Sequence, residues 1–188
     1  MRNLLTLIFF LSFSVVYSQT IGRYNYNWVS LGAGLFHESS STGFSGFSLY
    51  LSSDNSIEKL SKKDDKLKKY NHYLKLRFMG HIRPGDEHNW GQFYDVGILY
   101  GKSYGEVLRV SFSGGFGVLG GKYDVVKLIP PGVLGTTTER ITAFNIPFDL
   151  NLSVSSKWVG FGITGFANLN SKESMTGFIV KLEMGKIR

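Results

Sequence analysis

Apolar and small polar residues alternate along most of the chain with a period of two, the spacing of side chains on the two faces of a β-strand. Eight segments carry this alternation, at residues 28–36, 46–51, 73–78, 94–101, 108–118, 144–154, 159–169 and 178–185. In the last segment the apolar face is formed by Phe178, Val180, Leu182 and Met184. The pattern predicts an all-β chain of eight antiparallel strands.

The polar face of these segments indicates what surrounds each side of the sheet. It is crowded with Gly, Ser and Asn, and such small residues suit the narrow interior of a closed barrel whose outer surface faces lipid. No charged residue falls on the apolar face in the middle of a segment, where Lys or Arg would cost about 2–4 kcal/mol at the bilayer midplane. We therefore predict an eight-stranded transmembrane β-barrel. A soluble lipocalin-like barrel would place the Gly and Ser face in water, which fits the pattern poorly.

The first residues have the features of an export signal. Arg2 gives a short basic start, an apolar run extends from Leu4 to Val16, and Ser18 offers a small residue at the cleavage position. The run is shorter than the ~20 apolar residues of a spanning helix. Since backbone polar groups in lipid must all be paired, a membrane protein without such helices must be a barrel. The sequence predicts a cleavable signal peptide at residues 1–18, a barrel domain at 19–188 and export to an outer membrane of the Gram-negative type.

The composition limits the chemistry and the partners. The chain has no cysteine, which excludes disulfides and an N-terminal lipidated cysteine. The formal net charge is +7, and much of it lies between Lys59 and Lys69. An exported barrel does not meet nucleic acid, so we expect outer-membrane lipid, including lipopolysaccharide, as its partner. A second candidate partner is another outer-membrane or periplasmic protein. No cofactor is predicted.

With both termini in the periplasm, the connections alternate between outside and inside. The predicted outer loops are His37–Gly43, His81–Gln92, Gly120–Arg140 and Asn170–Met175, and the predicted inner turns are Ser52–Asn71, Ser103–Gly105 and Ser155–Lys157. Periplasmic turns are normally short, but Ser52–Asn71 is long and basic. Two interpretations stay open for it, a solvated insertion with a brief helix or a basic surface for a periplasmic partner.

Aromatic residues gather near the ends of the predicted strands, where interfacial belts of Tyr and Trp are expected in membrane barrels. One predicted rim comprises Tyr24, Tyr26, Trp28, Tyr70, Tyr104 and Trp158, and the other comprises Phe36, Phe44, Trp90 and Phe93. We expect these side chains to lie at the two membrane interfaces.

The face predicted to point inward also carries charges of both signs. The cations are Lys75, Arg77, Arg109 and Lys181, and the carboxylates are Asp95, Asp149 and Glu183. Unpaired charges are costly in a narrow lumen of low dielectric constant. We predict a paired network that fills the lumen and fixes the register of the strands. A proton or ion path is the alternative, although eight strands leave little room for water.

The predicted outer loop Gly120–Arg140 is unusually apolar for an exposed loop. Its apolar residues are Val125, Val126, Leu128, Ile129, Pro130, Pro131, Val133 and Leu134. One interpretation is a loop folded over the mouth of the barrel. The other is a docking surface for a partner protein, since exposed apolar patches often mark interaction sites.

Two short segments contain residue types that occur in catalytic or metal sites. The segment His81–His88 holds two His and two carboxylates, but their spacing matches no standard metal motif. It partly resembles the His-x-Ser-Asn segment of lipid A deacylase barrels, although Arg83 stands in place of the serine and Pro84 in place of the asparagine. The types of residue in His37-Glu38-Ser39 suit acyl transfer, but adjacency in sequence does not give triad geometry. No catalytic or metal-binding residue is therefore predicted.

After the signal peptide the whole chain resembles small eight-stranded outer-membrane barrels of the OmpA/OmpX-like class. The segment Phe144-Asn-Ile-Pro-Phe148 is similar to the aromatic-x-Ile-Pro segment of PorT-like barrels, and Gly177–Arg188 is similar to the closing strand of such proteins, although it ends in Lys-Ile-Arg rather than an aromatic. The resemblance implies a structural, adhesive or accessory role and no particular reaction. We therefore expect a non-enzymatic outer-membrane barrel, a structural or accessory subunit of an envelope complex. The alternative is a lipid A-modifying hydrolase at the outer rim, with His37 or His81 as its base.

Overall fold

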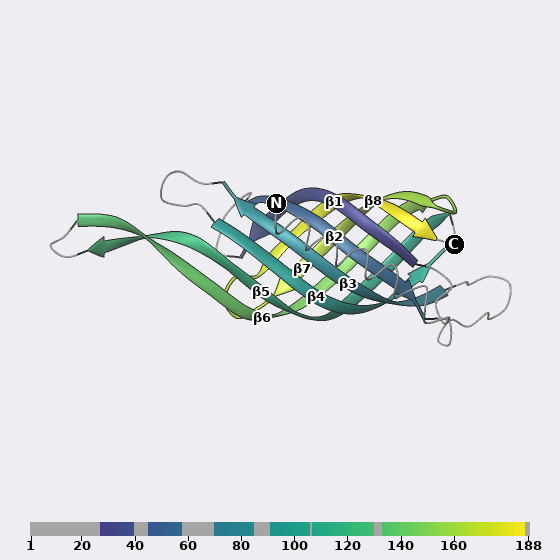
Figure 1. Ribbon diagram of the computed structural model, residues 1–188, viewed down its shortest axis with the longest axis horizontal. Helices are drawn as coiled ribbons and strands as arrows, with labels where there is room; N and C mark the ends of the chain where they lie inside the picture. The colour runs from purple at the N-terminus through teal and green to yellow at the C-terminus, as the bar shows by residue number, and fades with distance from the viewer. Residues whose placement is uncertain are drawn as a thin grey trace, which may run out of the picture.

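In the computed structural model, which describes residues 27–39, 45–57, 70–84, 91–105, 107–129 and 133–186, the strands close into one antiparallel barrel (Figure 1). The strands are β1 (Asn27–Glu38), β2 (Gly46–Ser56), β3 (Tyr70–Arg83), β4 (Gly91–Tyr104), β5 (Leu108–Ile129), β6 (Val133–Ser155), β7 (Val159–Leu169) and β8 (Met175–Lys186). Each strand pairs with its neighbours in sequence, and β1 pairs with β8 to complete the ring. The predicted all-β fold with eight antiparallel strands is confirmed. Within the described residues, no helix is long and apolar enough to cross a membrane.

The strands are staggered around the barrel. Paired residues can be followed once around the wall from Asn145 on β6, and the path returns to β6 at Ser155, ten residues further along. It passes through Gly117, Gly97, Arg77, Ser52, Ser30, Glu183 and Gly160. With a rise of about 3.3 Å per residue and a strand spacing of about 4.8 Å, this stagger corresponds to a strand tilt of roughly 40°. Eight strands enclose an interior just wide enough for side chains to fill.

The outer face of the wall is apolar along its whole circumference. Large hydrophobic side chains from every strand point outward, and Phe116 and Phe161 are 67% and 66% exposed. Such exposure is costly in water, at about 25 cal/mol per Å² of apolar surface, and is relieved where the surrounding medium is itself apolar. The residues between them point inward and are buried, as Lys75 and Arg77 on β3 are. The predicted assignment of the two faces is confirmed.

The interior divides into two halves along the barrel axis. The terminal half, where β1 starts and β8 ends, holds most of the buried charges together with Trp28 and Tyr73. The hairpin half, named for the β5–β6 hairpin that projects from that end, holds a cluster of buried, mainly apolar side chains. Its members are Phe36, Tyr50, Met79, Phe93, Leu119, Ile141, Phe166, Met175 and Ile179.

The predicted aromatic belts are partly wrong. Trp28, Phe36 and Phe93 lie near strand ends as expected, but they point into the lumen and are at most 5% exposed. The alternation of the strand places these residues on the inward face. A side chain on that face points into the lumen even when it lies near the end of the strand. Tyr104 and Trp158 are exposed. Tyr24, Tyr26, Phe44, Trp90 and the side chain of Tyr70 lie outside the described residues.

The prediction that Gly120–Arg140 forms an outer loop is also wrong, because most of this segment belongs to two strands. β5 continues to Ile129 and β6 begins at Val133, with pairs from Gly120↔Thr142 to Ile129↔Val133. The register of β5 with β4 ends at Tyr123, so the outer part of the hairpin rises beyond the wall, at the left of Figure 1. Its β-branched residues, among them Val125, Val126 and the run Thr136–Thr138, favour this extended pairing.

The predicted inner turn Ser52–Asn71 is shorter than expected. β2 continues to Ser56, and β3 begins at Tyr70, so both ends of that segment belong to the barrel wall. The basic stretch between them, with its expected helix, lies outside the described residues, as do residues 1–26 with the predicted signal peptide.

Candidate functional site: the filled lumen and the projecting hairpin

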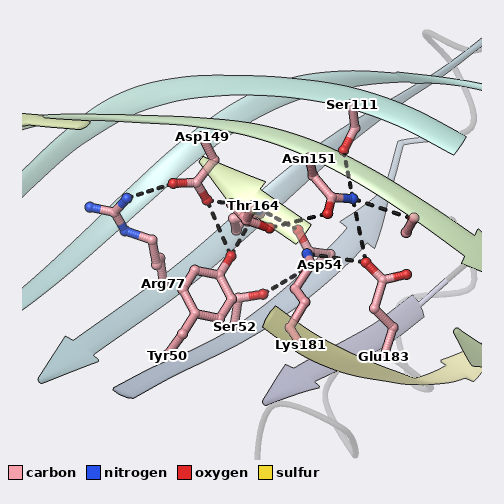
Figure 2. A network of polar contacts seen from close by, with 12 residues as sticks. Tyr50, Ser52, Asp54, Arg77, Ser111, Asp149, Asn151, Thr164, Lys181 and Glu183 are labelled. Atoms are coloured by element: carbon pink, nitrogen blue, oxygen red, sulfur yellow. Dashed lines mark hydrogen bonds and ion pairs between the residues drawn. The ribbon is translucent and has the colours of Figure 1, made fainter. Parts of the chain in front are cut away.

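A network of ion pairs centred on Asp149 crosses the middle of the lumen (Figure 2). Lys75 Nζ lies 2.9 Å from Asp149 Oδ2, and Arg77 Nη1 lies 2.6 Å from Asp149 Oδ1. Tyr50 donates its hydroxyl hydrogen to Asp149 Oδ2 at 3.1 Å and accepts a hydrogen bond from Lys75 Nζ at the same distance. The carboxylate of β6 is therefore held by β2 and β3, from the opposite side of the barrel, through charge-assisted bonds.

The second nitrogen of the Arg77 fork extends this network to β4 and β7. Arg77 Nη2 lies 2.8 Å from Asp95 Oδ1 and also donates to the side-chain oxygen of Asn168. Asn168 in turn donates its amide hydrogen to Asp95 Oδ2 at 2.7 Å. One guanidinium thus binds two carboxylates and an amide, a geometry that the planar fork of Arg supports and a Lys could not reproduce.

A second cluster surrounds Glu183 in the terminal half. Lys181 Nζ lies 3.1 Å from Glu183 Oε1, and Arg109 Nη2 forms an ion pair with Glu183 Oε2. The guanidinium of Arg109 also stacks on Trp28, 4.4 Å from the ring centroid. Tyr50 links the two clusters, because Lys181 and Lys75 lie 5.6 and 5.8 Å from its ring centroid.

Sequence reasoning did not place Asp54 in the lumen. It was assigned to the inner turn Ser52–Asn71, but it lies on β2 opposite Lys75, is 1% exposed and accepts a hydrogen bond from Ser52 Oγ at 2.8 Å. Lys75 Nζ lies 3.7 Å from its Oδ1. With Asp54 included, four of the five buried carboxylates lie beside the four buried Lys and Arg side chains that the sequence placed inside, and the fifth, Glu38, pairs with Arg83. The alternation Ser52, Asp54, Ser56 on β2 is the signal that would have found it.

His81 was predicted in an outer loop, and this prediction is wrong. β3 runs to Arg83, and His81 points into the lumen with 1% of its surface exposed. Its Nδ1 lies 2.8 Å from Ser48 Oγ and its Nε2 lies 3.2 Å from Asp95 Oδ2. The imidazole packs between Phe36 and Phe166, with ring centroids 5.1 and 5.8 Å away.

The Ser48, His81 and Asp95 side chains form a relay like that of a hydrolase triad, but the surroundings do not suit catalysis. In the triad of serine proteases the serine contacts Nε2 and the aspartate contacts Nδ1, and here the two nitrogens are exchanged. All three residues are at most 1% exposed, and Asp95 is already bound to Arg77 and Asn168. A nucleophile closed off in this way reaches no substrate, so the relay serves to satisfy buried polar groups.

Arg83 connects the rim of the barrel to the base of the hairpin. Its Nη1 donates to Glu38 Oε2 at 2.7 Å, and its guanidinium lies 5.8 Å from the ring centroid of Phe93 and 5.9 Å from that of Tyr123. Tyr123 on β5 donates its hydroxyl hydrogen to Glu139 on β6 at 3.2 Å. The ends of β1, β3 and β4 are thereby tied to the point at which the hairpin leaves the wall.

Six of the eight apolar residues proposed for partner binding fall on the outer part of this hairpin. Val125, Val126, Leu128 and Ile129 belong to β5, and Val133 and Leu134 belong to β6, while Pro130 and Pro131 lie outside the described residues. The strand residues nearest the tip are paired in register, Leu128 with Leu134 and Ile129 with Val133. Across the described part of the chain, no group of three or more His, Asp or Glu side chains is arranged to hold a metal ion.

No protein-family model matches this chain, and no curated protein matches it in sequence. Solved structures with the same fold exist. Neisserial surface protein A (NspA) superposes with a TM-score of 0.61 at 11% sequence identity, over 84% of this chain and 96% of that one. The attachment invasion locus protein Ail of Yersinia pestis superposes with a TM-score of 0.56 at 10% identity, over 86% and 98% of the two chains. Both are small outer-membrane β-barrels. The likeness shows an eight-stranded barrel fold of that type, as the sequence predicted.

Proposed function

We propose that the chain is a non-enzymatic barrel of an outer membrane, a structural or accessory subunit of an envelope complex that binds its partner through the β5–β6 hairpin. The apolar outer face supports this location, because its exposed Leu, Val, Ile and Phe side chains suit a lipid environment. A signal peptide at residues 1–18 would direct the chain there.

The hairpin is the observation that carries the proposed role. β5 and β6 have 22 and 23 residues, whereas the other strands have 11 to 14. A two-stranded ribbon alone in water gains little stability. The apolar residues Val125–Leu134 therefore favour a hairpin that packs against a second protein.

The filled lumen supports a role at the surface of the barrel. The ion network and the apolar cluster together occupy the interior over its length, which disfavours a diffusion pore. The buried state of His81 removes one of the two bases considered for a lipid A hydrolase. The other base considered, His37, is exposed on the outer side of β1.

The test shortens the hairpin without disturbing its base. Residues 124–138 are replaced by Asn-Gly, the two-residue turn that suits a tight hairpin, between Tyr123 and Glu139, which are paired in register. The contacts of Arg83 and Tyr123 are retained. We expect the shortened chain to migrate as a heat-modifiable barrel in the outer-membrane fraction and to lose a stoichiometric companion that co-purifies with the full chain.

A matched control keeps the length of the hairpin and changes only its exposed threonines, as Thr136→Ser and Thr138→Ser. This variant should retain the companion. If the shortened hairpin retains it as well, the docking surface lies elsewhere. Loss of heat-modifiable migration in the shortened chain would instead show that the hairpin is needed for folding.

A further inference from the structure

The pairing of β5 with β6 is interrupted at one place in the barrel wall. The pairs are continuous up to Gly114↔Phe148 and resume at Gly117↔Asn145, but the two positions between them are not paired. The other strand pairs of the ring show no such interruption over their described lengths. On β6, the residue of the gap that points into the lumen is Pro147, which is buried.

The direction of the backbone N–H groups explains the gap. Ser155 N donates to Val107 O on the β5 side at 2.8 Å, so every second residue of β6 counted from Ser155 points its N–H group toward β5. Pro147 is one of these residues and has no N–H group. By the register of the flanking pairs it lies opposite Gly115. The carbonyl group of Gly115 therefore lacks the donor that the ladder supplies at the neighbouring pairs.

The outer side of the gap offers this carbonyl no other donor. Aromatic rings lie on both sides of it on the outer face. Phe112 and Phe148 stack with ring centroids 6.4 Å apart, and the centroids of Phe116 and Phe144 are 5.9 Å apart. Neither such rings nor lipid hydrocarbon can donate a hydrogen bond, and a buried backbone carbonyl without a donor is costly. A donor for Gly115 O must therefore come from the lumen.

The inner face beside the gap holds an amide that suits this need. Asn145 is 0% exposed, and neither its Oδ1 nor its Nδ2 has a hydrogen-bond partner among the described residues. A strand carbonyl follows its own Cα along the chain, so Gly115 O lies on the side of Gly117, the residue paired with Asn145. Gly115 and Gly117 have no side chains that could lie between the carbonyl and the amide.

The two groups together meet the requirements of an internal water molecule. Buried waters typically make two to four hydrogen bonds to polar groups that have no other partner. Here the water donates one hydrogen to Gly115 O, while the amide of Asn145 can both donate to the water and accept from it. A water-mediated bond of this kind is nearly as favourable in enthalpy as a direct one.

We propose that Asn145 holds one ordered water molecule on the lumen side of the gap, and that this water donates the hydrogen bond to Gly115 O that Pro147 removes. Asn145 is then a positioning residue for the water, and the water completes the β5–β6 ladder inside the wall. The site depends on the barrel fold and not on the partner proposed for the hairpin. It also gives the segment Phe144–Phe148 a physical logic, because Pro147 opens the ladder and Asn145, two residues earlier, closes it.

The first test is a crystal structure of the full chain, purified from outer membranes, at a resolution that shows ordered water. We expect density for one water at hydrogen-bonding distance, about 2.5–3.2 Å, from both Gly115 O and the amide of Asn145. A direct hydrogen bond from Asn145 to Gly115 O, or a gap without a water, would overturn the proposal.

The second test measures the equilibrium constant of unfolding in urea, in phosphatidylcholine vesicles, with heat-modifiable migration as the readout. Asn145→Leu keeps the approximate size of the side chain and removes the amide, so Gly115 O loses its donor. We expect the unfolding constant to rise about tenfold. In the Pro147→Val background, where residue 147 has an N–H group for Gly115 O, the same change should alter the constant by less than about threefold.

Ser30→Ala is the matched control. Ser30 Oγ is also buried and has no hydrogen-bond partner among the described residues, but Ser30 lies in uninterrupted pairs with both neighbouring strands. This variant should change the unfolding constant by less than about threefold. An equal effect of Asn145→Leu with and without Pro147, or an equal rise in the Ser30→Ala variant, would show that Asn145 does not act through the gap.

Discussion

The two halves of the lumen are filled by different chemistry, although the same eight strands line both. In the terminal half and the middle of the barrel, Asp149 is held by Lys75, Arg77 and Tyr50, so one side chain of β6 depends on partners from β2 and β3. In the hairpin half, side chains such as Met79 and Phe166 pack against one another without directional bonds. In the charged half each carboxylate is held by specific partners. In the hairpin half His81 and Glu38 also form directional bonds, but the apolar side chains around them are constrained mainly by the volume that they fill.

This difference has an energetic consequence. Removing one partner of a buried ion pair leaves a charge without compensation and costs about 3–5 kcal/mol. Truncating a buried apolar side chain costs about 2–5 kcal/mol, depending on how far the surroundings collapse, and a swap of similar volume usually costs less than about 1.5 kcal/mol. Substitutions that keep the volume of a side chain should therefore show a larger difference in unfolding free energy between the two halves than truncations to Ala.

The largest effect is expected for Asp149→Ala, which leaves both Lys75 and Arg77 without their shared carboxylate. The free energy of unfolding should fall by about 3–5 kcal/mol. It is measured by urea unfolding in phosphatidylcholine vesicles, followed by heat-modifiable migration. Asp124→Asn is the control, because Asp124 is a half-buried hairpin residue whose replacement can still accept the hydrogen bond from Thr138, and it should change the unfolding free energy by less than about 0.5 kcal/mol. Similar values for the two variants would mean that the central network contributes little.

The next effect is expected for Met79→Ala in the apolar half. The lost packing of a fully buried side chain should lower the unfolding free energy by about 2–4 kcal/mol in the same assay. Met79→Leu keeps the volume and should cost less than about 1.5 kcal/mol. If the Leu variant is as unstable as the Ala variant, the apolar half is as specific as the charged half, and the comparison fails.

A smaller effect is expected for Asp54→Asn. The change keeps the shape of the side chain and removes one of the two carboxylates that lie near Lys75, which retains Asp149. We expect a loss of about 1–3 kcal/mol in the unfolding free energy. Combining it with Lys75→Met should recover part of the loss, because the excess positive charge is then removed. A double variant whose loss equals the sum of the single losses would show that the two side chains are not coupled.

The smallest effect is expected for Ser48→Ala, which removes the hydroxyl group bound to His81 Nδ1. The unfolding free energy should fall by about 0.5–1.5 kcal/mol, the usual value of one buried hydrogen bond. Lipid A mass spectra from cells with the wild type and with this variant should be identical. A difference in lipid A acylation between the two would show that the buried relay is catalytic.

The sequence predicted the charged half of the lumen better than the apolar half, for a physical reason. The period of two assigned Lys75, Arg77 and Asp149 to the inward face. This assignment is clear because each charged residue stands between apolar residues that point outward. The same period also places Met79, Phe93 and Phe166 inward, but Phe93 was expected at a membrane interface because of its aromatic ring, and Met79 and Phe166 were given no position. In a barrel that faces lipid, hydrophobicity does not separate inside from outside, so only the position in the alternation does.

The ends of the strands were the other part that the sequence did not predict. Three segments were assigned to connections because they contain polar residues or glycines or are followed by prolines. These segments are Ser52–Ser56, His81–Arg83 and Gly120–Ile129. In the structure they continue the wall or the hairpin, since the stagger of the barrel carries each strand beyond the apolar band. Asp54 and His81 were misplaced for this reason alone. The partner assigned to the hairpin stays a prediction.

The central claim is that the barrel is inserted in a membrane and closed inside, so that its function lies on its outer surface and hairpin. It is tested most directly by conductance across a planar bilayer after insertion of the purified chain, with insertion verified by heat-modifiable migration of the recovered protein. The account predicts no current steps above background for the wild type. Discrete, reproducible steps from the inserted wild-type chain would contradict it and would show a continuous path for ions through the lumen.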